Sequence, residues 1–146
     1  MIIKLEQDLS AKDIEILIKY KTMNKDVERV SAILQSVDKQ IACSMEGGEK
    51  LIAASDIYYI ESVDKKTYVY CEKNVYRIEQ PLYQLTEDLA YSGFVQINKS
   101  CVLNLNVLDS IKTLVNSRLE ATLKNGERLL VTRKYLDSIK QTLAEG

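Results

Sequence analysis

The chain has 146 residues, with 20 lysines and arginines against 21 aspartates and glutamates, and no histidine. A net charge of −1 means that any nucleic-acid face must come from local clustering of charge. The absence of histidine removes histidine-based catalysis and most zinc sites, and no Gly-rich phosphate loop occurs. We therefore expect no enzyme activity and no cofactor. Because the sequence has no apolar run of about 18 residues and no signal peptide, we expect a cytoplasmic protein.

Residues 1–40 are predicted to form a small unit of two strands and one helix. Ile3 and Leu5 alternate with charged neighbours, and apolar and polar residues alternate over 13–21, which is typical of strands. A helix beginning at Ser10 is the alternative for the second segment. Asn24 is suited to cap a helix whose apolar stripe runs over 27–37. So short a unit cannot bury a core alone. It must pack on the rest of the chain or on a second copy, and we expect a homodimer.

Residues 41–146 are predicted to form a second, mainly β domain, which makes the whole chain α+β. Strands are expected at 57–62 and in three hairpins, which join 41–45 to 50–53, 68–71 to 75–78 and 119–123 to 128–131. Asn125-Gly126 is the strongest hairpin signal in the chain. Two short helices are expected, one beginning at Pro81 and one capped by Thr132.

The three cysteines, Cys43, Cys71 and Cys101, are odd in number and widely spaced. This pattern is typical neither of a disulfide framework nor of a zinc site. We interpret the cysteines as small buried hydrophobic residues.

Six segments, in the right order and spacing, resemble the LytTR DNA-binding domain. They are DIYYIES (56–62), the helix at 81–89, GFVQINKS (93–100), VLN (102–104), the Asn-Gly hairpin at 119–128 and VTRKYL (131–136). The resemblance covers residues 41–143. It implies a bacterial transcription regulator built from short antiparallel sheets with two short helices. Such regulators bind double-stranded DNA through loops in successive major grooves, commonly at direct repeats.

The resemblance places three segments of this chain against DNA. The first contains Lys65, Lys66 and Thr67, whose ammonium and hydroxyl groups suit phosphate contact, although an ordinary solvated turn would look the same. The third contains Arg133 and Lys134 at the start of a helix. Two cations are unfavourable at the positive end of a helix dipole, and a bound phosphate would relieve that conflict.

The second segment contains Asn98, Lys99 and Ser100. Asparagine can read adenine, lysine can donate to guanine acceptors, and serine can donate to a phosphate oxygen. Asn98 stands where the family mostly has histidine, and Gln96 stands where arginine is common, so the base preference is open. Outside the three segments, Arg118 is a weaker candidate for a backbone contact.

Forty residues cannot hold a receiver domain, so we expect no phosphoaspartate switch and a resemblance to small stand-alone LytTR regulators. The genes of such regulators often lie beside a gene for a small membrane protein that restrains the regulator. Such a membrane protein is a candidate partner of this chain. Two other functions remain open. One is a protein–protein module that binds such a membrane protein, which the near-neutral charge favours. The other is an RNA-binding β domain.

Overall fold

The structure is a computed structural model that describes residues 1–115 and 118–143, apart from the side chains of 138 and 140–143. Its helices are α1 (Lys25–Asp38), α2 (Leu82–Asp88) and α3 (Arg133–Leu143), with short 3-10 turns η1 (Ala54–Asp56), η2 (Ala90–Ser92) and η3 (Leu105–Val107). Its strands are β1 (Gln40–Met45), β2 (Gly48–Ala53), β3 (Ile57–Val63), β4 (Lys66–Cys71), β5 (Val75–Ile78), β6 (Phe94–Asn98), β7 (Cys101–Asn104), β8 (Leu108–Thr113), β9 (Leu119–Leu123) and β10 (Arg128–Val131).

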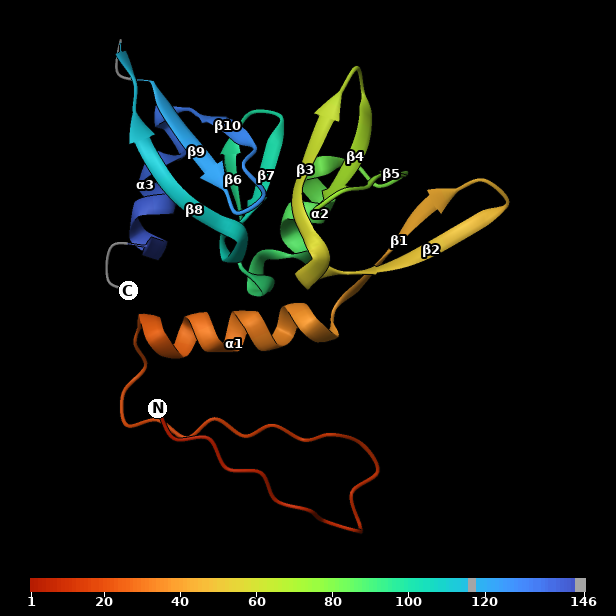
Figure 1. Cartoon of the computed structure of the whole chain (residues 1–146), viewed down its shortest axis with the longest axis vertical. Coiled ribbons are helices and arrows are strands. Elements are labelled where there is room, and N and C mark those ends of the chain that lie inside the picture. The colour runs from red at the N-terminus through yellow and green to blue at the C-terminus, as the bar shows by residue number, and fades with distance from the viewer. Residues whose placement is uncertain (116–117, 144–146) are drawn as a thin grey trace.

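These strands form two antiparallel sheets. The larger has the order β2-β1-β5-β4-β3-β7-β6, and the smaller has the order β10-β9-β8. Figure 1 shows the smaller sheet beside β6 and β7, with α3 on its outer side and α2 behind β3. The predicted mainly β fold with short antiparallel sheets is therefore confirmed.

The three predicted hairpins are confirmed, because β1 pairs with β2, β4 with β5 and β9 with β10 in antiparallel register. Gly47 and Gly48 have φ values of 83° and 157°, and Gly126 has a φ of 89°. Gly47 and Gly126 adopt the left-handed conformation that glycine takes without a steric cost, so each reverses the chain tightly between two strands. The helix after Pro81 is also present, although Pro81 is its N-cap and Leu82 its first residue.

Two hydrophobic cores hold the sheets and helices together. One joins the larger sheet to α2 through Ile60, Leu85 and Leu89, which are fully buried. The other joins β6 and β7 to the smaller sheet and α3, and includes Leu123 and Ile139. Cys43 lies in the first core and Cys101 in the second, as predicted for small buried hydrophobic residues, whereas Cys71 is half-buried.

A buried asparagine fixes the chain where β7 ends. Asn104 is fully buried, and its Nδ2 donates to the Ile57 carbonyl at 2.9 Å while its Oδ1 accepts from the Asn106 backbone N–H at 3.0 Å. A buried amide of this kind is tolerated because both of its polar ends are paired. These bonds tie β7 to the start of β3.

The prediction of two strands in residues 1–24 was wrong, because this described segment contains neither helix nor strand. It runs out from the body and back as an open loop below α1 (Figure 1). The alternation of apolar residues is real, but a strand also needs a partner for its backbone groups, and an isolated pair of strands is marginal in water. The helix alternative from Ser10 is not formed either.

The predicted helix of the N-terminal unit is confirmed as α1. The side chain of Asn24 caps it, accepting from the Val27 backbone N–H at 3.0 Å. α1 contacts η1, η2 and β2 of the rest of the chain, with Ser36 buried against them. Of the apolar stripe, Ile33 and Val37 remain exposed. The helix therefore packs on its own chain, which was one of the two arrangements expected.

Candidate nucleic-acid interface

The β3–β4 turn presents two lysines at its tip. Asp64 and Lys65 have φ values of 50° and 65°, so both central residues of this two-residue turn are left-handed. That geometry suits the right-handed twist of the flanking strands. Lys65 and Lys66 are exposed, whereas Thr67 is 6% exposed and lies behind the tip. The lysines are therefore the side chains of this turn that reach solvent.

The β6–β7 turn is held by the side chain of Asn98. Its Nδ2 donates to the Leu130 carbonyl of β10 at 2.8 Å, and its Oδ1 accepts from the backbone N–H of Ser100 at 2.9 Å and from the Ser100 hydroxyl at 3.2 Å. Both polar ends of the amide are thus committed within the protein. Lys99 lies between Asn98 and Ser100 at the exposed tip of the turn. The side-chain amide of Gln96 donates to the Lys99 carbonyl at 3.4 Å.

The junction of β10 with α3 presents two further cations. Arg133 and Lys134 are the first two residues of α3 and are exposed. Thr132 precedes them, and its carbonyl accepts from the Tyr135 backbone N–H at 3.0 Å. The ammonium of Lys134 lies 5.5 Å from the centre of the Tyr135 ring, which is within the range of a cation–π contact.

Hydrogen bonds between strands bring these three segments together. The Ser62 backbone N–H donates to the Ser100 carbonyl at 2.8 Å, which joins the end of β3 to the β6–β7 turn. The Thr132 backbone N–H donates to the Ile97 carbonyl at 3.0 Å, which joins the same turn to the start of α3. In Figure 1 the β3–β4 turn, the β6–β7 turn and the β10–α3 junction all lie at the upper end of the sheets.

This end of the molecule concentrates positive charge that the net charge conceals. We define the basic edge as Lys65, Lys66, Lys99, Arg118, Arg133 and Lys134. Within the described part of the chain, none of the six forms an ion pair with a carboxylate. Across the turn residues 64–67, 98–100 and 132–134, Asp64 is the one carboxylate.

Arg118 joins the basic edge from the β8–β9 connection. It precedes β9 and is exposed, and its carbonyl accepts from the Leu114 backbone N–H at 2.6 Å. The ends of β8 and β9 that this connection joins lie at the same upper end in Figure 1. Lys124, by contrast, follows the other end of β9 and is not part of the edge.

The comparison with known proteins decides the family. The profile of the LytTr DNA-binding domain matches residues 47–144. The chain belongs to the LytTR family. A solved LytTr DNA-binding domain from Bacillus cereus is similar in structure, with a TM-score of 0.66 at 25% identity over 71% of this chain and 95% of that one.

LytTR proteins of two kinds are similar in sequence. The sensory transduction protein LytT of Enterococcus faecalis (strain ATCC 700802 / V583) is 25% identical over 72% of this chain and 44% of its own length. LytT of Bacillus subtilis (strain 168) is 24% identical over 88% of this chain and 54% of its own. The chain thus spans about half the length of these relatives. A Staphylococcus aureus (strain MSSA476) protein, described as an uncharacterized HTH-type transcriptional regulator, is 24% identical over 97% of this chain and 98% of its own length.

Reasoning from the sequence missed the structural role of Asn98 in the LytTR domain. The pattern Asn98-Lys99-Ser100 is that of an Asx turn, in which an asparagine side chain accepts from the N–H two residues on. That signal was present in the sequence. The bond from Asn98 to β10 was not predictable, because Leu130 is distant in the sequence.

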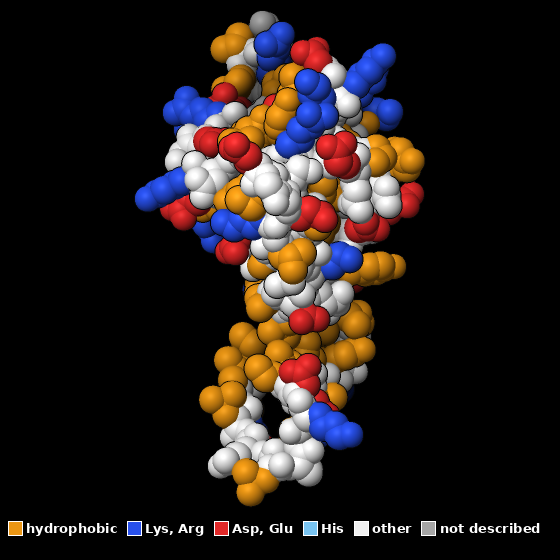
Figure 2. All heavy atoms as spheres, turned by 90° about the vertical axis from the view of Figure 1, so that its right-hand side faces the viewer, with side chains coloured by type: hydrophobic (Ala, Val, Ile, Leu, Met, Phe, Trp, Pro, Cys, Tyr) orange, Lys and Arg blue, Asp and Glu red, His pale blue; other side chains and the backbone are white. Residues whose placement is uncertain are grey.

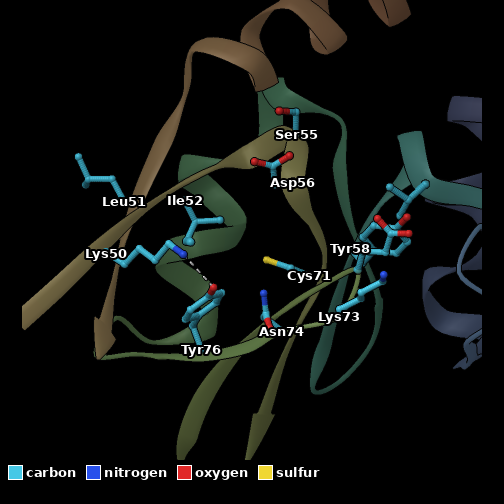
Figure 3. A pocket seen from close by; sticks show the side chains of 12 residues that line it. Lys50, Leu51, Ile52, Ser55, Asp56, Tyr58, Cys71, Lys73, Asn74 and Tyr76 are labelled. Carbon is cyan, nitrogen blue, oxygen red and sulfur yellow. Dashed lines mark hydrogen bonds between the residues drawn. The ribbon is translucent and has the colours of Figure 1, made fainter. Parts of the chain in front are cut away.

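A cavity of about 590 Å³ lies away from the basic edge, between β2, β3 and β5 (Figure 3). In it Lys50 donates to the Tyr76 hydroxyl at 3.3 Å, with its ammonium 5.4 Å from the ring centre. Burial, followed by the charge of Asp56, raises the pKa of the Cys71 thiol. A thiol of this kind is a poor nucleophile.

The described residues contain no group of three or more Cys, Asp or Glu side chains placed to hold a metal ion. No helix in the same part of the chain is long and apolar enough to cross a membrane.

Proposed function

We propose that this LytTR protein is a bacterial transcription regulator, and not an enzyme, that binds double-stranded DNA through its basic edge. The observation that carries the proposal is the meeting of three separate turns at one end of the domain, each with unpaired cations. Side chains at the tips of narrow turns can enter a major groove, which admits protein elements of that width. The names of the relatives, LytT and transcriptional regulator, support the same role.

Different cations of the basic edge contact phosphates and bases. Lys65, Lys66, Arg118 and the α3 residues Arg133 and Lys134 contact phosphates and release counterions. The unpaired N–H groups at the start of α3 add to phosphate binding there.

Lys99 projects from the β6–β7 turn, which the hydrogen bonds of Asn98 hold in place. Lys99 contacts base edges, since lysine donates to the guanine acceptors O6 and N7. The amide of Asn98 and the hydroxyl of Ser100 hold that turn in place. We therefore assign these two residues, with the buried Thr67, to positioning the contacts and not to reading adenine.

Sequence-specific binding would place loops of the basic edge in successive major grooves along one face of the duplex. A protein with two copies would then occupy direct repeats about one helical turn, or 34–36 Å, apart. A regulator of this kind acts in the cytoplasm as a homodimer, and a small membrane protein is a candidate partner that restrains it.

The test is fluorescence anisotropy of the full chain on duplex DNA from its own promoter, across a salt series. If the five cations assigned to phosphates make those contacts, the logarithm of the binding constant should fall against that of the salt concentration with a slope of about −4.5. Lys99→Ala should reduce discrimination between promoter and unrelated DNA. The double change Arg133→Ala/Lys134→Ala should weaken binding to both and reduce the slope by about 2.

Lys39→Ala is the matched control, because it removes an exposed cation next to α1 at the other end of the molecule. It should leave binding unchanged. Binding that is insensitive to salt and to the edge variants would contradict the proposal and favour a protein–protein module. Preference for a duplex RNA competitor would favour an RNA-binding domain instead.

A further inference from the structure

The N-terminal segment, residues 1–24, contains two arms that lie apart from each other. The first arm is residues 2–7 and the second arm is residues 13–21. A turn joins them: the Ala11 backbone N–H donates to the Asp8 carbonyl at 3.1 Å, and the Asp8 carboxylate accepts from the Ser10 backbone N–H at 2.9 Å. The described backbone shows no hydrogen bond between the arms. Figure 2 shows open space between the two sides of this segment at the bottom of the view. Unpaired N–H and C=O groups along such an arm can pair with another strand.

The second arm has two different faces. Ile16, Ile18 and Tyr20 line a cavity of about 720 Å³ that α1 and β6 also line. Leu17 does not line that cavity and is 79% exposed. Side chains that alternate between two faces are typical of a strand. The second arm therefore already has the side-chain arrangement of a strand, without a partner.

We propose that the second arm pairs antiparallel with the second arm of another copy of this chain, centred on Leu17. The pair would be two-fold symmetric, so that each Leu17 lies opposite its counterpart. On the face of Leu17, Glu15 then lies opposite Lys19 of the other copy, and Asp13 lies opposite Lys21. Because symmetry repeats each contact, this face carries four pairs of opposite charge, and directly opposed charges of this kind stabilise a strand pair.

The other face of the pair is entirely apolar in this register. Ile14 lies opposite Tyr20 of the other copy, and Ile16 lies opposite Ile18. Ile16, Ile18 and Tyr20 of this face line the cavity beside α1, so the second copy would add apolar side chains next to that cavity. Moving the centre by one residue to Ile16 or Ile18 would place Leu17 opposite Glu15 or Lys19. The charges and the apolar residues thus favour the same register, as expected where one face of a strand is buried.

The exposed apolar area of the second arm suits a small interface. The second arm contains four large hydrophobic side chains that are at least half exposed: Ile14, Ile16, Leu17 and Tyr20. Burying each one removes roughly 100 Å² from water, which follows from its transfer free energy. Together they offer about 400 Å² per chain, and interfaces of this size are typical of weak association. In Figure 2 hydrophobic side chains gather along the N-terminal segment and where it meets the body.

The location of the arms makes this inference independent of the proposed DNA binding. The N-terminal segment lies below α1, at the end opposite the basic edge (Figure 1). Pairing of the arms leaves the basic edge uncovered. The tests below use no DNA, so their failure would contradict the proposed homodimer but would leave the proposed DNA contacts standing.

The first test is sedimentation velocity of the full chain at concentrations up to about 100 µM, where a weak dimer would still form. The wild type should be a dimer and Leu17→Asp a monomer, because that change sets two carboxylates against each other at the centre. Leu17 lies outside both cores, so the variant should keep the wild-type circular dichroism spectrum. A wild type that stays monomeric overturns the proposal. Partition of that monomer onto lipid vesicles would assign the arms to a membrane surface instead.

The second test exchanges the charges. Glu15→Lys and Lys19→Glu should each raise the dimer Kd by about tenfold at low salt, since each turns two attractive pairs into repulsive ones. The double variant Glu15→Lys/Lys19→Glu should restore the wild-type Kd. Failure of the double variant to recover would overturn the Glu15–Lys19 register.

The third test is disulfide cross-linking under mild oxidation. Leu17→Cys should form a covalent dimer, since directly opposite residues have Cα atoms about 4.5–5.5 Å apart, within the range of a disulfide. Glu15→Cys alone should not cross-link, but Glu15→Cys/Lys19→Cys should. The wild type, with its own three cysteines, is the blank. Cross-linking of Glu15→Cys alone, to the same extent as Leu17→Cys, would contradict the register.

Discussion

Replacing Lys65 by glycine should stabilise the fold while weakening DNA binding. Lys65 has a φ of 65° in the β3–β4 turn. A residue other than glycine costs about 1–2 kcal/mol in this region, whereas glycine loses about 0.5–1 kcal/mol through its greater freedom in the unfolded chain. The free energy of unfolding should therefore rise by about 0.5–1 kcal/mol. For a chain of 146 residues this raises Tm by about 2–3 °C.

The assay is a thermal melt followed by circular dichroism, together with anisotropy on promoter DNA. Lys66→Gly is the matched control, because it removes the same charge from the adjacent residue, which lies in β4. Glycine within a strand should lower Tm, and both variants should reduce the salt slope by about 0.9. If Lys65→Gly melts at or below the wild-type temperature, or if Lys66→Gly melts as high, the strain argument is refuted.

Two further outcomes are expected. Asn98→Ala removes the bonds to Leu130 and Ser100, so the free energy of unfolding should fall by about 1–2 kcal/mol in a urea titration. DNA affinity should fall as well because the β6–β7 turn is no longer held, and an unchanged affinity would contradict the bracing role. Burial, together with the nearby Cys71, raises the pKa of the Cys43 thiol to about 11 from its ordinary 9.0. The folded state thus retains a proton that the unfolded chain releases, and stability should be full below pH 9 and fall between pH 9 and 11. Cys43→Ala should reduce that fall, and equal pH profiles would refute the assignment.

Local turn chemistry made much of the β domain predictable from sequence. The hairpins at Gly47 and at Asn125-Gly126 form as expected, because such residues adopt positive φ with little cost and set the pairing of adjacent strands. β6, β7 and β8 were not predicted as strands. β7 is buried at every position and so lacks the alternation that marks a half-exposed strand.

The prediction of strands in residues 1–24 was wrong for a related reason. Alternation in the sequence reports which side chains share a face, but the backbone partner must come from elsewhere. For β3 that partner is β4, only two residues away, whereas the second arm has none among the described residues of its chain.

The candidate site was predictable in its residues but not in its geometry. The sequence placed Lys65, Lys99 and Arg133 in three separate segments. Their meeting at one edge depends on the pairing of β3 with β7 and on the contact of β6 with β10, which no local pattern encodes. The contact of β6 with β10 also allows the bond from Asn98 to Leu130, which the sequence position of Asn98 alone did not reveal.

In the turns that carry the basic edge, the residues that hold the turn in place differ from the cations at its tip. Asn98 fixes the β6–β7 turn through its side chain, while Lys99 between the anchored positions reaches solvent. Substitution of an exposed tip residue such as Lys99 usually changes the free energy of unfolding by less than about 0.5 kcal/mol. Tip residues can therefore diverge while Asn98 and the residues of both cores stay the same. A duplicated gene could in this way acquire a new target sequence in a few steps, without compensating changes inside the domain.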